Sequence, residues 1–332
     1  GVANATRGEG VRRGVGYAVG IKNIGFSEGF DDFSTARVRL RLGRDGRPHA
    51  EVHTAAAEVG QGLVTVCAQV AAAELGVADV AVRDADTSIA SAGSSSASRQ
   101  TYCTGGAVRD ASRAVRDHVL GLAVERLGLA VDPSRLALRD GAVVTAEGQH
   151  VAALAQVLDG QAVEETRVFR HPATQALDAE TGQGRAHAQH AFAAHRAVVD
   201  VDVDLGLVRV VELATAQDVG RAINPLAVEG QLEGGAAQGL GLALMEEVRV
   251  EDGIVRNASF TDYLIPTILD MPPLRADVLE LGDPDAPYGL KGVGEPPTIS
   301  STPAIVAALR AATGRPLTRV PVRPQDIVLR DP

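Results

Sequence analysis

A single carboxylate, Glu295, lies in segment 288–298, which has the sequence YGLKGVGEPPT. Three glycines in this segment lack a Cβ atom and would let the backbone approach a bound group closely. The pair Pro296-Pro297 fixes two φ angles and disfavours the α region for the residue before it, so we expect a stiff loop around this one acid. A carboxylate held in this way is a candidate general base. The alternative is an ordinary turn whose glutamate is solvated.

A second candidate is Gly60-Gln61-Gly62, which precedes a run of apolar residues at helical spacing between Leu63 and Gly76. We expect an extended segment to enter a helix at this point, where free backbone N–H groups and the helix dipole favour anionic ligand groups. The amide of Gln61 carries a donor and an acceptor and could bind the edge of a heterocycle. A strand-to-helix turn without a ligand is the alternative.

A third candidate is segment 93–102, GSSSASRQTY, which runs into an Ala/Val/Leu-rich stretch ending near Leu127. The stretch has the pattern of an amphipathic helix. Four serines, Arg99 and Gln100 supply many hydrogen-bond donors, which suit a phosphate and a pterin-like ring. Capping of the helix by Ser and Thr, or a flexible serine linker, are the alternatives.

The fourth candidate follows Asn224-Pro225, the order expected for an N-cap and a first helical residue. Five glycines follow within the helical pattern up to residue 246, and each costs a helix roughly 1 kcal/mol relative to Ala. Such a cost indicates that something lies close to the backbone. Either a second helix packs tightly there, or a cofactor binds beside an inward-facing Gln231.

These motifs, together with Asn257-x-Ser-Phe-x-Asp-Tyr-x-x-Pro266, resemble the C-terminal half of the molybdenum-cofactor-binding large subunit of the xanthine dehydrogenase/aldehyde oxidoreductase family. They occur in the family's order, and the resemblance runs from about Arg13 to Pro321. It implies an α+β fold in which mixed sheets pack on long helices. It also implies that Glu295 is the general base.

The resemblance further implies that the pterin, either plain or as its cytosine dinucleotide, holds the molybdenum without a protein ligand. Cofactor contacts are implied for residues of four segments: Gly60, Gln61 and Gly62; Ser96, Ala97, Ser98, Arg99 and Gln100; Gln231; and Lys291, Gly292 and Gly294. Lys291 could instead be structural. The three histidines at 187, 190 and 195 have no cysteine or carboxylate among them, so we interpret them as solvated or hydrogen-bonded side chains rather than a zinc site.

The implied reaction is oxidative hydroxylation with water as the oxygen source. Segment 21–33 resembles bacterial xanthine dehydrogenases with a separate molybdenum chain, and Phe26 falls near a phenylalanine that stacks on the purine there. A purine such as xanthine or hypoxanthine is therefore the favoured substrate, although Phe26 could equally be a core residue. Aldehydes, other nitrogen heterocycles and carbon monoxide stay open. A non-catalytic scaffold that binds partner subunits is the alternative from a different class.

The electron-transfer groups are expected on other chains or domains. Two cysteines, Cys67 and Cys103, cannot ligate 2Fe–2S clusters, and no dinucleotide fingerprint for FAD follows a predicted strand. The expected partners are the N-terminal half of the molybdenum subunit and iron–sulfur and FAD subunits. The formal net charge of -10 argues against nucleic acid, and the apolar stretches are too short for a membrane. Few cysteines and no signal peptide predict a cytoplasmic protein.

The 332 residues are expected to form two halves with the cofactor between them. Residues 1–160 would be a first molybdopterin-binding subdomain, and 161–332 a second one that carries the Glu295 loop. Residues 1–35 are predicted to be loose and 161–187 rich in loops. A short unit is predicted from Asp132 to about Gly160, a hairpin around Leu205-Gly206, and helices at 225–246 and 303–313.

Overall fold

The computed structural model describes residues 10–27, 29 and 32–328 and has an α+β fold. The chain divides into two compact units that interleave in sequence. The described parts of the first unit are 10–22, 190–281 and 293–328, and those of the second are 23–27, 29, 32–189 and 282–292. The predicted division after residue 160 thus falls inside the second unit, because pairing between distant strands decides which segments belong together.

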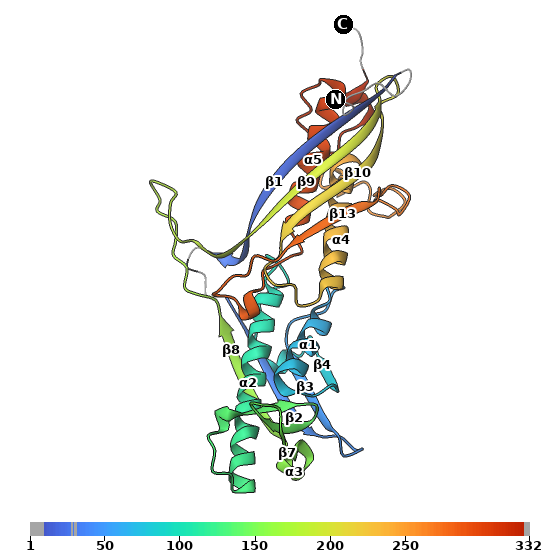
Figure 1. Cartoon of the computed structure of the whole chain (residues 1–332). Coiled ribbons are helices and arrows are strands. Elements are labelled where there is room, and N and C mark those ends of the chain that lie inside the picture. The colour runs from blue at the N-terminus through green and yellow to red at the C-terminus, as the bar shows by residue number, and fades with distance from the viewer. Residues whose placement is uncertain (1–9, 28, 30–31, 329–332) are drawn as a thin grey trace. The chain divides into compact units, whose positions relative to one another are not determined.

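The first unit is built on a four-stranded sheet (Figure 1). Its strands are, in spatial order, β1 (Val11–Ser27), β9 (His187–Asp202), β10 (Leu207–Asp218) and β13 (Leu274–Leu279). The antiparallel pair β9–β10 is the hairpin predicted around Leu205-Gly206. Strand β13 pairs parallel to β10 and was not predicted.

Strand β1 contradicts the expectation of a loose segment, since 17 residues of it form one continuous strand; residues 1–9 of that prediction lie outside the described residues. Its glycines recur at alternate positions and let a helix pack directly on the backbone. A Cβ atom on Gly14 would lie 2.0 Å from the carbonyl oxygen of Ala308, and one on Gly16 would lie 2.2 Å from the backbone nitrogen of the same residue. A glycine-rich strand buried under a helix therefore replaces the predicted loop.

Two helices cover this sheet, α4 (Pro225–Leu244) and α5 (Pro296–Thr313). Helix α4 starts as predicted, because the side chain of Asn224 accepts a hydrogen bond from Ala227 N at 3.0 Å. Helix α5 ends at Gly314 as predicted but begins earlier than residue 303. Proline is tolerated in the first helical turn, where the missing N–H would have no intrahelical acceptor.

The five glycines of α4 fall into two groups. A Cβ atom on Gly235 would lie 2.7 Å from Pro297 Cβ, and one on Gly239 would lie 1.8 Å from Ser301 Oγ, so both permit close packing against α5. Gly241 faces Glu246 and Pro266 in the same way. By contrast, apart from the neighbouring residues and the nearby backbone of α4 itself, no described atom lies within 4 Å of the Cβ positions of Gly230 and Gly234. Tight packing therefore explains Gly235, Gly239 and Gly241. At Gly230 and Gly234 the backbone has room for another group beside it.

The second unit contains a four-stranded sheet covered by two helices (Figure 1). The strand order is β4 (Val80–Arg83), β3 (Pro48–Thr54), β2 (Phe33–Leu42) and β8 (Val163–Arg170), and the helices are α1 (Leu63–Leu75) and α2 (Gln100–Leu127). Both helices agree with the predicted bounds and end at left-handed glycines. The stretch 161–187, which was predicted to be rich in loops, contains strand β8, which pairs antiparallel with β2.

The remaining elements are small. A three-stranded sheet and a short helix form the unit predicted between Asp132 and Gly160: β5 (Leu136–Arg139), β6 (Ala142–Thr145), β7 (His150–Ala153) and α3 (Leu154–Leu158). The first unit adds β11 (Val250–Glu251), β12 (Ile254–Val255) and α6 (Pro324–Ile327). Within residues 10–27, 29 and 32–328, no helix combines the length and apolar character needed to cross a membrane.

Candidate functional site

Glu295 is the N-cap residue of α5 rather than a residue of a free loop. Its backbone has φ −85° and ψ −34°, so it lies in the α region. Its carbonyl oxygen accepts a hydrogen bond from Thr298 N at 3.1 Å. The expectation that Pro296 forces Glu295 out of the α region is therefore wrong, because the restriction before proline is a preference that the helical hydrogen bonds outweigh here.

The carboxylate of Glu295 is partly exposed and paired with a lysine. Its Oε2 atom lies 3.1 Å from Nζ of Lys22, and the side-chain exposures are 42% and 19% respectively. Lys22 lies on β1, so the acid is held between a strand and the start of a helix. The positive end of the α5 dipole also favours a negative charge at this position.

Gln231 lies at the same end of the helix pair as Glu295. Helices α4 and α5 run in the same direction, because Gly235 meets Pro297 and Gly239 meets Ser301. Gln231 precedes Gly235 by about one helical turn and is partly buried. The first unit therefore brings these two predicted site residues to one end of the α4–α5 pair.

The segment before Glu295 is tied to the same unit by its backbone. Val293 packs against the small cluster of Val219, Val228 and Leu232, and its carbonyl oxygen accepts a hydrogen bond from Gln217 Nε2 at 3.0 Å. Gly294, which was predicted to contact the cofactor, is partly buried between these anchors and Glu295.

In the second unit, Arg99 connects the segments around it by hydrogen bonds. All five of its N–H donors are used: Nε and one Nη2 donor bind Asp32, and the others bind carbonyl oxygens of Ala92, Ser94 and Phe33. Its side chain is fully buried. The guanidinium was predicted to contact the cofactor, but its hydrogen bonds hold the loop itself in place.

Ala97 and Ser98 have left-handed backbones, with φ of 55° and 50°. Such a conformation is unfavourable for residues with a Cβ atom and persists only where surrounding contacts fix it. The carbonyl oxygen of Ala97 accepts a hydrogen bond from Gly25 N at 2.9 Å. A Cβ atom on Gly292 would lie 2.3 Å from the carbonyl oxygen of Ser98. The structure therefore brings two of the predicted cofactor segments, 96–100 and 291–292, into contact.

Gln100 and Phe26 are also engaged within this unit. Gln100 is buried, donates to Ser94 O at 2.9 Å and accepts a hydrogen bond from Thr104. The Phe26 ring is partly buried and lies 5.7 Å from Cζ of Arg99, a cation–π contact. The hydroxyls of Ser94 and Ser96 are 2.6 Å apart on the exposed side of the loop. Lys291 is partly buried beside Leu290, whose carbonyl oxygen accepts a hydrogen bond from Gln189.

The start of α1 is occupied by a carboxylate of the chain itself. Glu58 accepts hydrogen bonds from the N–H groups of Gly60, Gly62 and Val64 at 2.8, 3.0 and 2.9 Å. Desolvation raises the pKa of Glu58, but these N–H groups together hold it below its usual range. The expectation of free N–H groups for a ligand is therefore wrong at this helix.

The side-chain amide of Gln61 likewise forms hydrogen bonds within its own loop. Its Oε1 atom accepts a hydrogen bond from Val59 N at 2.6 Å, and its Nε2 atom donates to Ala57 O at 2.9 Å. The amide was expected to be available for a heterocycle, but it stabilises the turn that Gly60 and Gly62 form with positive φ.

His195 is buried on β9 and hydrogen-bonded to α5. Its Nδ1 atom lies 2.8 Å from Ser300 Oγ, and Ser300 Oγ donates to Pro296 O at 3.2 Å. Burial lowers the pKa of His195 to about 4, so the ring is neutral.

Neither His187 nor His190 joins it in a metal site, since the described residues contain no group of three His, Cys, Asp or Glu side chains that could hold a metal ion. Cys67 and Cys103 are free and buried, and burial raises the pKa of both thiols to about 12.

Three residues that matter for this geometry were not identified from the sequence. Lys22 could have been found, because it ends an alternating Gly-x-Gly-x-Ala-x-Gly-x-Lys pattern at 14–22. Glu58 could have been found as an acid just before a helix start. For Asp32, no local pattern indicates that it pairs with Arg99.

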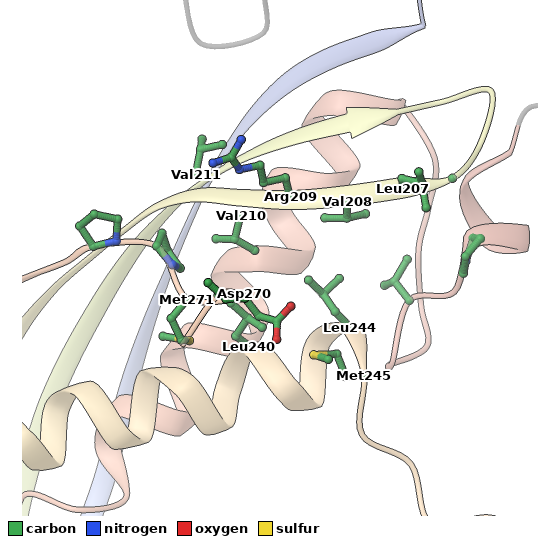
Figure 2. Close-up of a pocket in the computed structure, with 16 residues that line it drawn as sticks. Leu207, Val208, Arg209, Val210, Val211, Leu240, Leu244, Met245, Asp270 and Met271 are labelled. Atoms are coloured by element: carbon green, nitrogen blue, oxygen red, sulfur yellow. The ribbon is translucent and has the colours of Figure 1, made fainter. Parts of the chain in front are cut away.

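A cavity of about 540 Å³ lies elsewhere in the first unit (Figure 2). Val208 and Val210 of β10 point into it across from Leu240 and Leu244 of α4, whereas Arg209 and Val211 point away. Asp270 at its edge accepts hydrogen bonds from the backbone N–H and hydroxyl of Thr267, which lower its pKa and make it the cap of a turn. Among the described residues that line this cavity, none is a predicted site residue.

Comparison with known proteins is consistent with this geometry. A family model described as "Molybdopterin cofactor-binding domain" matches residues 2–272. The xanthine dehydrogenase molybdenum-binding subunit of Escherichia coli O157:H7 is 32% identical over 298 residues, which cover 87% of this chain and 38% of that protein. The 6-hydroxypseudooxynicotine dehydrogenase complex subunit gamma of Paenarthrobacter nicotinovorans is 33% identical over 339 residues, which cover 98% of this chain and 40% of that protein.

A solved structure, quinoline 2-oxidoreductase from Pseudomonas putida 86, matches with a TM-score of 0.79 and 28% identity. The match covers 96% of this chain and 42% of that chain. These matches confirm the predicted resemblance and the α+β fold class. The chain spans about two fifths of the length of the curated relatives it matches.

Proposed function

Because this chain belongs to the molybdopterin cofactor-binding domain family, we propose that it is the C-terminal part of the catalytic subunit of a molybdenum hydroxylase. The proposed reaction is the hydroxylation of a purine carbon, RH + H₂O → ROH + 2 H⁺ + 2 e⁻. Xanthine or hypoxanthine is the proposed substrate, supported by the likeness to the xanthine dehydrogenase subunit. In this proposal Glu295 is the general base of the reaction.

The observation that carries the proposal is the position of the Glu295 carboxylate. It lies at the start of α5, partly exposed, with Lys22 at 3.1 Å. One carboxylate oxygen contacts the lysine, and the proposed role of the carboxylate is to accept a proton during hydroxylation.

The residues of the chain fit a molybdenum–pterin group through backbone and small side chains. The open positions at Gly230 and Gly234 allow a flat ring to lie against the α4 backbone next to Gln231. The left-handed turn at Ala97-Ser98 is held by the Asp32–Arg99 pair, which is the kind of strained loop that positions a ligand. When bound, the molybdenum cofactor would accept the two electrons of the reaction.

The residues proposed to hold the cofactor fall into four segments: Gly60, Gln61 and Gly62; Ser96, Ala97, Ser98, Arg99 and Gln100; Gln231; and Lys291, Gly292 and Gly294. Within this set we assign Arg99 the role of fixing its loop, because each of its donors already has an acceptor in the chain. The proposed partners are the N-terminal half of the molybdenum subunit and carriers of 2Fe–2S clusters and FAD, which would receive the electrons.

The test is Glu295→Gln in the assembled enzyme, with xanthine as substrate and an artificial electron acceptor. Loss of a general base is expected to lower turnover at least about 100-fold, while molybdenum content stays at the wild-type level. Unchanged turnover would show that Glu295 is not the base. Loss of molybdenum would show that it holds the cofactor instead. A wild-type complex that contains no molybdenum would favour the scaffold role.

A second candidate substrate class is a different nitrogen heterocycle. It is favoured by the match to the 6-hydroxypseudooxynicotine dehydrogenase subunit over 98% of this chain, and Phe26 already contacts Arg99 rather than standing free for a purine. Turnover of xanthine compared with that of a pyridine and an aldehyde, measured on the same complex, separates these classes. Extraction of the cofactor from that preparation would show whether it carries the cytosine dinucleotide.

A further inference from the structure

Strand β1 presents one continuous face of small residues that ends in a lysine. Side chains at alternate positions of a strand point to the same side, so Gly14, Gly16, Ala18, Gly20 and Lys22 share one face. No side chain on this face before Lys22 is larger than a methyl group. A helix can therefore lie directly on the strand backbone.

Helix α5 occupies this face along its length. A Cβ atom on Gly14 would lie within 3 Å of atoms of Ala308 and Ala312, and one on Gly20 would lie 2.9 Å from Ile299 Cγ1. As the strand advances, the contacts move back toward the start of the helix. The eight-residue step from Gly14 to Lys22 spans about 26 Å of strand, and the step from Ala312 to Glu295 spans about 25 Å of helix. Lys22 thus meets Glu295 because both elements have the same length between these points.

The first turn of α5 is also fixed from the next strand. Ser300 connects His195 of β9 to the carbonyl oxygen of Pro296 through two hydrogen bonds. The backbone that carries Glu295 is therefore anchored on both β1 and β9. The carboxylate itself is oriented by Lys22 at 3.1 Å.

We infer that Lys22 is a positioning residue for Glu295, holding one carboxylate oxygen at the start of α5. This inference rests on the proposed role of Glu295 as the base. An ammonium group at this distance restricts the direction in which the carboxylate points. Removing the lysine while keeping the strand leaves a carboxylate that is free to rotate.

The experiment compares Lys22→Met, Lys22→Gln and Lys22→Arg in the assembled enzyme. A base that is free to rotate is in the productive orientation for less of the time. Met and Gln at position 22 are therefore expected to lower kcat by about 10-fold with KM nearly unchanged, and Arg is expected to keep kcat near the wild-type value. Lys22→Gln keeps a polar side chain at this position, so it carries the test if Lys22→Met does not fold.

Arg13→Gln is the matched control. Arg13 lies on the same strand, is 18% exposed and pairs with Asp200 of β9 at 2.6 Å, but it is far along β1 from Glu295. Its replacement removes an ion pair from β1 and is expected to leave kcat near the wild-type value. A loss of kcat of the same size in Arg13→Gln would overturn the inference, since it would reflect a general disturbance of the strand.

A second measurement does not depend on turnover. Difference infrared spectra between each variant and the same variant with Glu295→Gln isolate the carboxylate bands of Glu295. These bands are expected to shift in Lys22→Met and Lys22→Gln, because the carboxylate loses its contact with the ammonium group. Unchanged bands overturn the inference. Retained turnover in Glu295→Gln overturns the base role, and with it the catalytic part of the inference, whichever way the bands move.

Discussion

Asp32 and Arg99 form an ion pair that is closed off from solvent, with 2.5 Å between Oδ1 and Nη2 and side-chain exposures of 2% and 0%. Asp32 also accepts a hydrogen bond from Phe26 N at 3.1 Å. The pair therefore joins the end of β1 to the loop that precedes α2. That loop contains the left-handed residues Ala97 and Ser98, and this buried pair is one of the contacts that hold its conformation.

Asp32→Asn is expected to destabilise the protein by about 3 kcal/mol. The substitution keeps the shape of the side chain but leaves the guanidinium charge buried without a counter-ion, and breaking a buried pair in this way typically costs about 3–5 kcal/mol. The lower end applies because three backbone carbonyls still accept from Arg99. Urea unfolding of the purified protein measures the loss.

The matched control is Asp45→Asn in the turn between β2 and β3. Asp45 lies 3.9 Å from Arg47, with side-chain exposures of 64% and 86%, and asparagine can still accept the hydrogen bond from Arg47 N. An exposed pair contributes little, so a change below about 0.5 kcal/mol is expected. Similar losses in both variants would mean that burial of the Asp32–Arg99 pair is not what matters.

Alanine at two glycines of α4 should have opposite effects. A Cβ atom on Gly239 would lie 1.8 Å from Ser301 Oγ and 2.9 Å from its Cβ, so Gly239→Ala forces α4 and α5 apart and is expected to cost about 1–3 kcal/mol. At Gly234 the same change meets open space and should stabilise the helix by up to about 1 kcal/mol. Thermal unfolding of the two variants measures the loss of stability in Gly239→Ala and the gain in Gly234→Ala.

The Gly234 variant also bears on the proposed cofactor site. If a pterin ring lies against the backbone there, Gly234→Ala should lower the molybdenum content of the assembled enzyme even though the protein is more stable. An unchanged molybdenum content together with higher stability would place the cofactor elsewhere. A loss of stability in Gly234→Ala would contradict the open space found around this residue.

Local patterns predicted those elements whose stabilising contacts are local. Helix α1 between Gly62 and Gly76 and the N-cap of α4 at Asn224 follow from periodicity and capping within a few residues. Strand β1 was missed because its glycines suggest a loop, and its stability comes from pairing with β9 and packing under α5. Strand β8 depends in the same way on β2, more than a hundred residues earlier in the chain.

The site was predictable as a set of segments but not as a set of contacts. Sequence motifs indicated 96–100 and 291–292 separately, and only the fold shows Gly292 against Ser98. Donor-rich side chains such as Arg99 and Gln61 suggested ligand binding, yet the hydrogen bonds found for them are made to other groups of the chain. A residue type shows what a side chain can bind, whereas burial and the nearest acceptors decide what it does bind.

The buried His195 should make stability depend on pH. Burial lowers the pKa of His195 to about 4 in the folded protein, whereas an unfolded histidine has a pKa of about 6.5. Below pH 6.5 the unfolded state therefore binds more protons, so stability is full above this pH and falls toward pH 4, by on the order of 2 kcal/mol between pH 8 and pH 5. His195→Gln should remove this component of the pH dependence in urea unfolding, whereas His150→Gln, at an exposed histidine of β7, should keep it. If His195→Gln retains the full wild-type slope, another group is responsible for it.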